Sequence, residues 1–378
     1  MTQEEATAAL GVRRQTLYAY ASRGRIQVCA DPNNPRRNLY SAVDVAALLR
    51  KRDRGRAHDR IAASTMSWGE PIIDTQISTI WRGRLFYRGQ DALRLAATAT
   101  LEQAAMLLWT VKTPPHFPTE PPEVAHPLSK ARACASLGIA AAEGHPAQGL
   151  SAAAMKTEAA GLVGRLASAL VELSDDEAPL HLRLAAAWGC EGQASLLRRA
   201  LVLLADQELS SSAFAARVAA STGGSMGAAA LSGLATLSGP LHGDAPVQVG
   251  ALLANVRLGG AEPTVRRWLA DGVKLPGFGH DLYPEGDPRA AELLSAFESS
   301  AAVQALIETV GRLTGLQPTI DVALASLAEQ CRLPEGGTFA LFAIGRSVGW
   351  MAHAIEQVTT GSLLRPRARY CGPEIVEG

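Results

Sequence analysis

Gly277-Phe278-Gly279-His280, followed by Asp287-Pro288-Arg289, is the stretch from which the fold and the chemistry of this chain can be inferred. Glycine lacks a Cβ and tolerates positive φ, so a glycine-flanked turn can bring the backbone close to a ligand. A histidine can exchange a proton near neutral pH, and the planar guanidinium of arginine matches a carboxylate. The stretch therefore predicts a site that binds a small carboxylic acid and acts on its carbonyl group.

Two other segments place a histidine and an aspartate on turns. His242 lies in Leu237-Ser-Gly-Pro-Leu-His-Gly243, and Asp321 ends Gln317-Pro-Thr-Ile-Asp321. Proline and glycine around His242 predict a helix terminus, where exposed backbone N–H groups can lower the pKa of an imidazole. With His280 these residues could form a general acid and base set, although each residue type alone more often serves a structural purpose.

The composition predicts a mainly α-helical protein with a large core. The 378 residues suggest two or three domains, and 47% apolar residues with only 5% aromatics favour helix over sheet. Apolar residues recur at three- and four-residue spacing over residues 93–108, 128–142, 152–173, 182–204, 213–237 and 245–258. From this pattern alone, both an all-α enzyme and an all-α scaffold remain open.

Two segments of the same region are predicted not to be helical. Residues 76–91 are short and partly alternating, with a turn at Arg82-Gly83, which predicts a small β-hairpin. Residues 113–127 are rich in proline and are predicted to form a loop. The sequence has no glycine pattern of the Rossmann or P-loop type.

Several functional classes are disfavoured. No apolar run reaches the roughly 18–20 residues of a membrane span, and the N-terminal MTQEEATAAL lacks the basic and apolar regions of a signal peptide. The five cysteines are far apart and have no CxxC spacing, which favours a reduced cytoplasm and no metal site. We therefore expect a cytoplasmic protein without a membrane partner.

The charge is unevenly distributed along the chain. Residues 1–60 hold 12 Lys and Arg against 6 Asp and Glu, a net charge of +6, and the remainder carries −6. A basic head on an acidic body suggests two modules with different partners. We place their boundary near residue 60, after the charge run of residues 50–56. That run could contact phosphate, or it could be a solvated helix end or hinge.

The basic head is predicted to contain short helices and a hairpin. Residues 3–10 and 13–23 form two predicted helices, and Gly24 is a favoured helix stop. A polar hairpin follows over residues 31–37. Ser41-Ala-Val-Asp44 has capping-box spacing and opens a third predicted helix through residue 49.

Several residues of the head match a known DNA-binding pattern. They are Ala9-Leu-Gly-Val12, Arg14-Gln-Thr-Leu-Tyr18, Arg23-Gly24, Arg36-Arg37, Tyr40-Ser41 and Asp44-Val45. This pattern resembles the helix-turn-helix of the MerR and excisionase type, whose second helix enters the major groove and whose hairpin is a wing. The resemblance implies that Arg13, Arg14 and Thr16 reach bases or phosphates, and that Arg36 and Arg37 reach the backbone. The alternative is a docking domain whose arginines form a solvated face.

The body carries further motifs in a fixed order. They are Tyr87-Arg-Gly-Gln-Asp91, Phe214-Ala-Ala-Arg-Val-Ala-Ala-Ser-Thr222, Gly345-Arg-Ser-Val-Gly-Trp-Met-Ala-His353 with Glu356-Gln357, and Arg365-Pro-Arg-Ala-Arg-Tyr370 with Gly372. With the segments around His242, His280 and Asp321, they resemble the citrate synthase family over most of residues 68–378. The resemblance implies a mainly α fold. A large helical domain of residues 61–222 plus 329–378 and a small one of residues 223–328 would follow a winged helix-turn-helix domain of residues 1–60.

The resemblance also implies a reaction. The family joins the methyl carbon of acetyl-CoA to the ketone of oxaloacetate and then hydrolyses the thioester, with CoA entering as part of the substrate and no other cofactor. Asp321 would remove a methyl proton, His242 would hydrogen-bond the enolate oxygen, and His280 would donate to the ketone. The small domain would close over the large one and exclude water.

The residues expected to hold the keto acid both match and depart from the family. Arg289 and Arg346 would bind the dicarboxylate, and Arg365 would reach it from the partner subunit of a homodimer. The alternative for all three is ordinary surface ion pairing. The family's Asp-His-Glu is Asp206-Gln207-Glu208 here, and glutamine cannot become cationic as histidine can. We therefore expect that Gln207 binds the dicarboxylate more weakly than the family's histidine does, or that the site accepts a different keto acid.

The residues near the CoA phosphates depart further. Many bacterial relatives have Arg-Val-Tyr-Lys after the second histidine, and this chain has Asp281-Leu-Tyr-Pro-Glu285. Repulsion between a carboxylate and a CoA phosphate could cost about 1 kcal/mol per close pair at a wet surface. The identity of the acyl-CoA is thus left open.

Two functions follow from these features. The first is an acyltransferase that condenses acetyl-CoA, or another acyl-CoA, with oxaloacetate or a related 2-keto acid. The second is a DNA-binding regulator whose citrate-synthase-like body dimerises and senses a carboxylate or an acyl-CoA. The two are compatible, and an inactive or structural paralogue is the third alternative.

Overall fold

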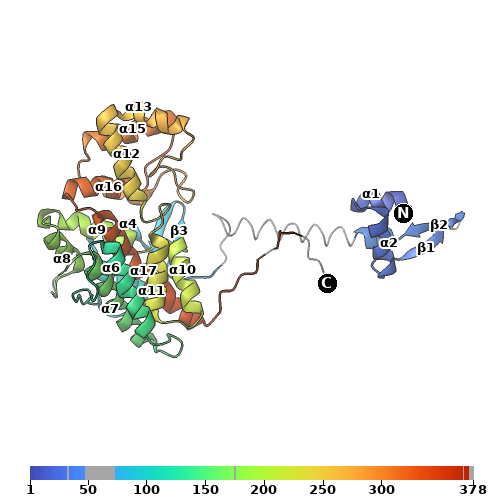
Figure 1. Cartoon of the computed structure of the whole chain (residues 1–378), viewed down its shortest axis with the longest axis horizontal. Helices are drawn as coiled ribbons and strands as arrows, with labels where there is room; N and C mark the ends of the chain where they lie inside the picture. Colours follow the sequence, from blue (N-terminus) through green and yellow to red (C-terminus); the bar gives the residue numbers. More distant parts are fainter. Residues whose placement is uncertain (32–33, 47–72, 174–175, 369, 374–378) are drawn as a thin grey trace. The chain divides into compact units, whose positions relative to one another are not determined.

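The computed structural model describes residues 1–31, 34–46, 73–173, 176–368 and 370–373. The chain divides into two units, Met1–Asp74 and Thr75–Gly378 (Figure 1). The boundary predicted near residue 60 and the charge run of residues 50–56 lie outside the described residues. So does the predicted third helix beyond residue 46.

The N-terminal unit packs two helices against a hairpin. Helices α1 (Gln3–Leu10) and α2 (Arg14–Ser22) precede the antiparallel strands β1 (Val28–Asp31) and β2 (Asn34–Tyr40). Among the residues that the structure describes, the core of the unit contains the buried apolar side chains Ala6, Leu10, Leu17, Ile26, Tyr40 and Val45. Residues 42–46 are helical, and the Ser41 hydroxyl accepts a hydrogen bond from the Asp44 N–H at 3.3 Å. This bond is one half of the capping box that the spacing predicts.

The second unit opens with the predicted hairpin. Strands β3 (Ser78–Trp81) and β4 (Arg84–Tyr87) pair antiparallel, and β5 (Gln90–Asp91) adds a short third strand. Arg82 and Gly83 at the turn have φ values of 50° and 70°. Two positive φ values in a two-residue turn match the right-handed twist of the flanking strands, so the hairpin prediction is confirmed.

The larger part of the second unit is built from helices that follow the apolar spacing. They are α4 (Ala92–Thr98), α5 (Leu101–Trp109), α6 (Ser129–Glu143), α7 (Ala152–Leu170), α8 (Leu180–Ala187), the 3₁₀ helix η1 (Glu191–Gln193), α9 (Ala194–Leu204), α10 (Ser211–Ser221) and α11 (Met226–Leu237). None of the described helices of the chain is long and apolar enough to cross a membrane.

Three helices predicted as continuous are in fact divided. The helix predicted over residues 93–108 is divided at Thr100, which caps the start of α5 through a capping box with Gln103. Gly189 and Gly223 have φ values of 63° and 80°, and such left-handed glycines terminate α8 and α10. Apolar spacing misses these breaks because the apolar residues resume in phase on the far side of each turn.

Helix α17 (Gly337–Thr360) lies at the centre of the larger core. It contacts α5, α7, α9, α10 and α11 and is buried on nearly every side. A Cβ added to Gly345 would lie 2.9 Å from the Leu204 Cβ, and one added to Gly349 would overlap Asp206. These glycines therefore let α17 pass close to α9 and to the turn that follows it.

A second, smaller core lies at the top of the body in Figure 1. Its surrounding helices are α12 (Ala245–Gly259), α13 (Ala261–Ala270), α15 (Ala301–Thr314) and α16 (Ile320–Cys331). Helix α14 (Pro288–Leu294) instead packs Ala290 and Leu293 into the larger core. Helix α16 belongs to both cores, since Val322 and Ala325 pack in the smaller one and Leu324 and Leu327 in the larger one. Its first turn, which carries Asp321, therefore lies where the two cores meet.

Candidate active site

Six of the residues predicted to contact substrate lie in five helices or in the turns next to them. Gln207 follows α9, His242 precedes α12, His280 precedes α14, Arg289 belongs to α14, Asp321 to the first turn of α16, and Arg346 to α17. A hydrogen bond links Gln207 to Arg289, and the amide nitrogen of Gln207 lies 3.2 Å from His280 Nε2. The charge of Arg289 acts on both histidines and on Asp321. The fold thus brings together residues that lie up to 139 positions apart in the sequence.

Gln207 connects Arg289 with His280. Arg289 Nη1 donates to the Oε1 atom of Gln207, which turns the amide NH2 group toward His280 at an Nε2 to Nε2 distance of 3.2 Å. The neighbouring Glu208 has a backbone φ of 47°, which is uncommon for a residue other than glycine. Its carboxylate accepts a hydrogen bond from the Ile80 N–H at 2.5 Å, so strand β3 holds the turn that presents Gln207.

His280 is partly buried and neutral. The Leu282 N–H donates to its Nδ1 atom at 3.2 Å, so the ring proton lies on Nε2. Burial, and then the charge of Arg289, lowers the pKa of His280 to about 4. Its Nε2–H therefore faces the amide NH2 group of Gln207.

Asp287 fixes the position of Arg289. Its buried carboxylate accepts from Arg289 Nε at 2.9 Å and from Arg289 Nη2 at 2.7 Å. It also accepts from the Ile320 N–H at 2.9 Å, at the start of α16. Although burial acts to lower the pKa of Arg289, Asp287 raises it above its ordinary value. One carboxylate thus ties Arg289 to the helix that carries Asp321.

Asp321 lies in the first turn of α16 and is partly buried. Thr319 Oγ1 donates to Asp321 Oδ2 at 2.8 Å and accepts from the Asp321 N–H at 3.3 Å. Burial raises the pKa of Asp321 to about 6, and the Thr319 hydroxyl and Arg289 oppose this only in part. Such a carboxylate is still ionised at neutral pH and is a stronger base than an exposed aspartate.

His242 lies in the turn between α11 and α12. Its ring packs edge-on against Phe342, with centroids 5.8 Å apart, and its Nε2 lies 2.8 Å from Ser212 Oγ. Burial lowers the pKa of His242 to about 3, with further contributions from Arg346 and Arg289. The direction agrees with the sequence-based expectation, but the causes are burial and two arginines rather than a helix terminus.

Arg346 is fully buried on α17, with none of its surface exposed. Its Nε donates to the Leu204 carbonyl at 2.9 Å, and its Nη1 donates to Ser210 Oγ at 3.1 Å. Its Nη2 is buried and has no hydrogen-bond partner among the described residues. Buried polar groups are nearly always paired, so this donor indicates a place for an acceptor from a ligand.

A buried polar network supports the residue before Gln207. His353 Nε2 lies 3.3 Å from Asp206 Oδ2, and Arg217 Nη1 lies 3.2 Å from His353 Nδ1. Because a guanidinium only donates, His353 Nδ1 accepts and its Nε2–H faces Asp206. Arg217 also pairs with Glu356 at 2.7 Å. The sequence motifs include His353 and Glu356, but their supporting role is visible only in the structure.

Residues 116–367 match the family described as "Citrate synthase, C-terminal domain". The chain belongs to the citrate synthase family. A relative from Haloferax volcanii, named "Citrate synthase", is 37% identical over 190 residues, which cover 46% of this chain and 49% of that protein. The chain thus spans about half the length of such relatives, whereas "Citrate synthase 2" of Bacillus subtilis is 28% identical over 79% of this chain and 93% of its own length.

The fold of a solved citrate synthase agrees with this assignment. The crystal structure of citrate synthase from Thermotoga maritima has a TM-score of 0.66 and a sequence identity of 26% to this chain. The similarity covers 82% of this chain and 96% of that one. The mainly helical citrate synthase fold expected from the sequence is therefore confirmed.

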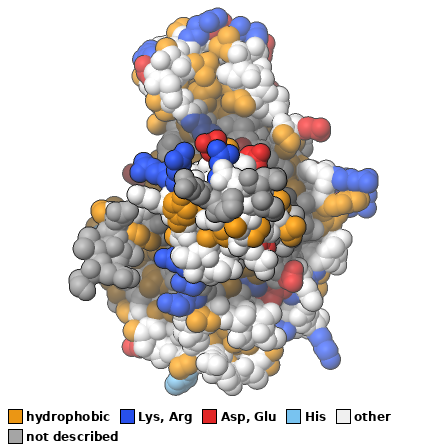
Figure 2. All heavy atoms as spheres, turned by 90° about the vertical axis from the view of Figure 1, so that its right-hand side faces the viewer, with side chains coloured by type: hydrophobic (Ala, Val, Ile, Leu, Met, Phe, Trp, Pro, Cys, Tyr) orange, Lys and Arg blue, Asp and Glu red, His pale blue; other side chains and the backbone are white. Residues whose placement is uncertain are grey.

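Three other residues compared with citrate synthase motifs lie on the surface, namely Arg365, which matches, and Asp281 and Glu285, which depart from them. Arg365 is exposed on the segment after α17, and Asp281 and Glu285 are exposed near His280. On the face seen in Figure 2, the top lobe carries hydrophobic side chains over its middle and Lys and Arg at its outer end. The exposed apolar residues of α12 include Val247 and Leu258, which are 53% and 88% exposed.

The residues predicted to contact DNA lie in the N-terminal unit. Arg13 and Arg14 are exposed at the start of α2, Thr16 is partly exposed in its first turn, and Arg37 is exposed on β2. The side chain of Arg36 lies outside the described residues. The start of α2 therefore presents two arginines to solvent.

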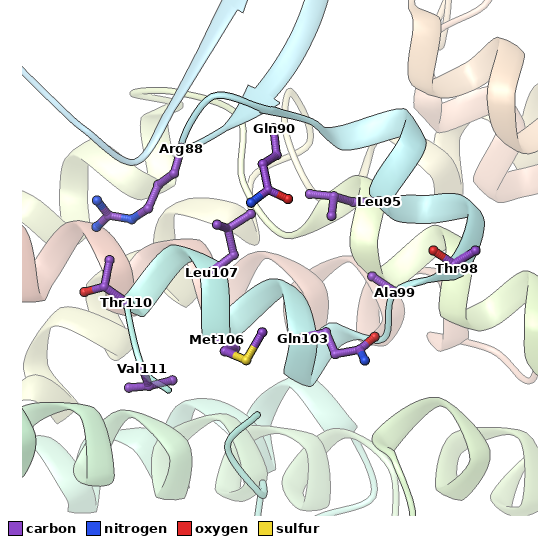
Figure 3. A pocket seen from close by; sticks show the side chains of 10 residues that line it. All are labelled: Arg88, Gln90, Leu95, Thr98, Ala99, Gln103, Met106, Leu107, Thr110 and Val111. Carbon is purple, nitrogen blue, oxygen red and sulfur yellow. The ribbon is translucent and has the colours of Figure 1, made fainter. Parts of the chain in front are cut away.

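A cavity of about 440 Å³ lies apart from the six residues of the candidate site. Figure 3 shows it between α4, α5 and the end of the hairpin, with Leu95, Met106 and Leu107 among its apolar lining. Arg88 borders it and donates from Nε to the Leu108 carbonyl at 2.9 Å. Across the described part of the chain, no group of three or more His, Cys, Asp and Glu side chains is placed to hold a metal ion.

Proposed function

We propose that this member of the citrate synthase family is an acyltransferase that condenses acetyl-CoA, or another acyl-CoA, with oxaloacetate or a related 2-keto acid. The observation that carries the proposal is the link through Asp287 between Arg289 and the start of α16. Next to that link, Asp321 has a pKa of about 6, and two histidines of low pKa lie in the same cluster. A base, two neutral donors and buried cations are what this condensation requires. CoA enters with the substrate, and no further cofactor is needed.

The thioester half of the site consists of Asp321 and His242. Asp321 removes a proton from the methyl carbon beside the thioester, and His242 donates a hydrogen bond to the oxygen that becomes the enolate oxygen. When Ser212 Oγ donates to His242 Nε2 across their 2.8 Å contact, the ring proton lies on Nδ1 and is available for that bond. A carbon acid of this kind is weak, so base and donor act together in a site without water.

The ketone half of the site consists of His280 and Arg289, with Gln207 between them. The enolate carbon attacks the ketone carbon and forms the new C–C bond. His280 gives its Nε2 proton to the resulting alkoxide, which is consistent with the Nδ1 bond from the Leu282 N–H. Water then cleaves the C–S bond and releases the CoA thiol.

Binding of the keto acid requires cations that face its carboxylates. Arg346 supplies a buried Nη2 without a partner among the described residues, and Arg289 supplies the N–H groups that Asp287 and Gln207 leave unused. Arg365 is exposed beyond the end of α17 in the single chain. In a homodimer, Arg365 of one subunit would reach the site of the other. Closure of the smaller core over the larger one would then exclude water.

The direct test is a thiol-release assay with acetyl-CoA and longer acyl-CoA donors against a panel of 2-keto acids. At least one pair should give turnover that is lost in the Asp321→Asn variant. If no pair gives turnover, or if the variant retains it, the proposed chemistry is wrong.

Gln207→His is expected to tighten the binding of oxaloacetate by about tenfold, the size expected for a hydrogen bond to a charged group. The imidazole can become cationic and donate to a carboxylate, whereas the amide cannot. The measurement is the KM or Kd for oxaloacetate, with Gln207→Leu as the control that removes both amide contacts. Unchanged or weaker binding by the histidine variant would indicate that the pocket suits a different acid.

A second candidate function is DNA binding by the N-terminal unit, and a specific observation favours it. Arg13 and Arg14 are exposed at the start of α2, in a segment of residues 1–60 whose net charge is +6. A helix start offers backbone N–H groups and, with flanking arginines, favours phosphate. The chain would then be a regulator whose citrate synthase body dimerises and senses a carboxylate or an acyl-CoA.

The affinity of the full chain for DNA of its own promoter region is expected to fall steeply with salt. Each lost phosphate contact reduces the steepness of the fall of log K with log salt by about 0.9. The double variant Arg13→Ala and Arg14→Ala should therefore reduce the slope by about 2. Arg266→Ala with Arg267→Ala, on the exposed face of α13, is the matched control and should change nothing. An absence of binding at low salt would contradict DNA binding.

A further inference from the structure

Tyr283 has a buried hydroxyl that the reaction steps above do not use. The side chain is 2% exposed, and its Oη has no hydrogen-bond partner among the described residues. Its backbone is held in place, because the Tyr283 N–H donates to the His280 carbonyl at 2.9 Å and the Gly286 N–H donates to the Tyr283 carbonyl at 3.0 Å. The hydroxyl is thus unpaired in a well-defined position and not at a mobile surface.

The surroundings of this hydroxyl belong to the keto-acid half of the site. The ring of Tyr283 lies 5.0 Å from that of His280, and the Arg289 guanidinium lies 5.4 Å from the Tyr283 ring centroid. The charged groups that act on the phenol are Arg289, Asp287, Glu208 and Arg346. Burial raises the pKa of Tyr283 to about 12, so the phenol is a donor throughout the neutral range.

Two buried donors of this region therefore lack partners within the described part of the chain, Tyr283 Oη and Arg346 Nη2. The two groups do not pair with each other, since a guanidinium N–H that donated to the phenol oxygen would give both a partner, and neither has one among the described residues. An anion with several acceptor oxygens satisfies both at once. Water could pair the hydroxyl, but unlike an anion it would add no negative charge beside Arg346, on which Asp206 also acts.

We propose that Tyr283 is a substrate-binding residue that donates its phenol O–H to a carboxylate of the 2-keto acid neutralised by Arg346. The inference rests on the proposed function and deepens it, since it adds a contact in the half of the site where Gln207 replaces the family's histidine. The cation lost at position 207 is then compensated in part by a neutral donor on the opposite loop. Tyr283 lies only three residues after His280, so the same loop presents the proton donor and the carboxylate contact.

The test is the Tyr283→Phe variant of the full chain, titrated with oxaloacetate by calorimetry and assayed for thiol release. The variant should bind oxaloacetate at least about tenfold more weakly, as for other hydrogen bonds to charged groups. Its KM for the keto acid should rise more than its kcat falls, and its KM for the acyl-CoA should stay the same. Its ligand-free Tm should be unchanged or higher, because phenylalanine removes an unpaired buried hydroxyl.

Tyr87→Phe is the matched comparison. The Tyr87 hydroxyl is buried but paired, since it donates to the Val202 carbonyl at 2.9 Å and accepts from the Asp206 N–H at 3.2 Å. Its removal should lower the ligand-free Tm, the opposite of the result expected for Tyr283→Phe. A lower ligand-free Tm in Tyr283→Phe would assign Tyr283 a structural role and overturn the inference.

The outcomes separate the two proposals. Equal affinity of wild type and Tyr283→Phe for oxaloacetate would overturn the role of Tyr283 and leave the proposed function intact. If oxaloacetate fails to bind the wild type, the same titration is made with pyruvate and 2-oxoglutarate. Failure of all three to bind the wild type would contradict the proposed function, and the role of Tyr283 together with it.

Discussion

Replacement of Asp321 by asparagine is expected to lower kcat by about a thousandfold, within the range found for the loss of a general acid or base. Asparagine has nearly the same shape and can still accept the hydrogen bond that Thr319 Oγ1 donates at 2.8 Å, but it cannot take a proton from carbon. Binding of oxaloacetate should be retained, because Arg289 and Gln207 are untouched. A variant that keeps more than a tenth of the wild-type kcat would contradict the assignment of the base.

Comparison of the wild type with the Asp321→Asn variant across pH tests the same assignment. Burial raises the pKa of Asp321 to about 6, so wild-type turnover should rise as pH increases through about 6, where the carboxylate becomes ionised. The folded pKa lies above the ordinary value of 3.8, so the native state binds more protons than the unfolded state between these two values. The stability contribution of Asp321 therefore falls as pH rises from about 4 to about 6. The variant lacks this dependence, so the unfolding free energy of the wild type minus that of the variant should fall as pH rises over that window.

Replacement of Arg289 by leucine is expected to lower the free energy of unfolding by about 3–5 kcal/mol, the usual result of removing one partner of a buried ion pair. The Asp287 carboxylate would stay buried and would keep only its backbone donors, the N–H groups of Ile320 and of residue 289. Denaturation by urea with the full chain measures the effect. Oxaloacetate binding should be lost as well, since the bond to Gln207 also disappears.

A double variant controls for the loss of side-chain packing. Asp287→Asn removes the charge that Arg289→Leu leaves unpaired, so the double variant should be more stable than the sum of the two single effects predicts. Additive effects, or a cost below about 1 kcal/mol for Arg289→Leu, would indicate that the pair is exposed to water in solution, as surface ion pairs are.

Part of the fold was predictable from the sequence because it depends on local patterns. The β3–β4 hairpin follows from Arg82-Gly83 between two short strands, and the helices of the body follow from apolar spacing. The breaks after α8 and α10 were not found, because a single glycine inside an apolar pattern is also compatible with a continuous helix. Only the structure shows that these glycines have positive φ values.

The candidate site was predictable only as a set of residues. His242, His280 and Asp321 are conspicuous in the sequence because glycine and proline surround two of them and a proline precedes the third. Asp287 was visible in the same motif as Arg289, but its bond to the Ile320 N–H at 2.9 Å joins segments 33 residues apart. Tyr283 gave no signal of its own, because a tyrosine in a loop is ordinary until its hydroxyl is found buried and unpaired.

The sequence by itself determined the family of this chain, the order of its motifs and the chemical types available at the site, because those follow from residue identity and local spacing. The tertiary structure decided the state of each group. The pKa of Asp321 is about 6 because packing on both cores buries its carboxylate, and His280 carries its proton on Nε2 because the Leu282 N–H occupies Nδ1. Burial and hydrogen-bond direction arise from contacts between distant segments, and no local pattern encodes them.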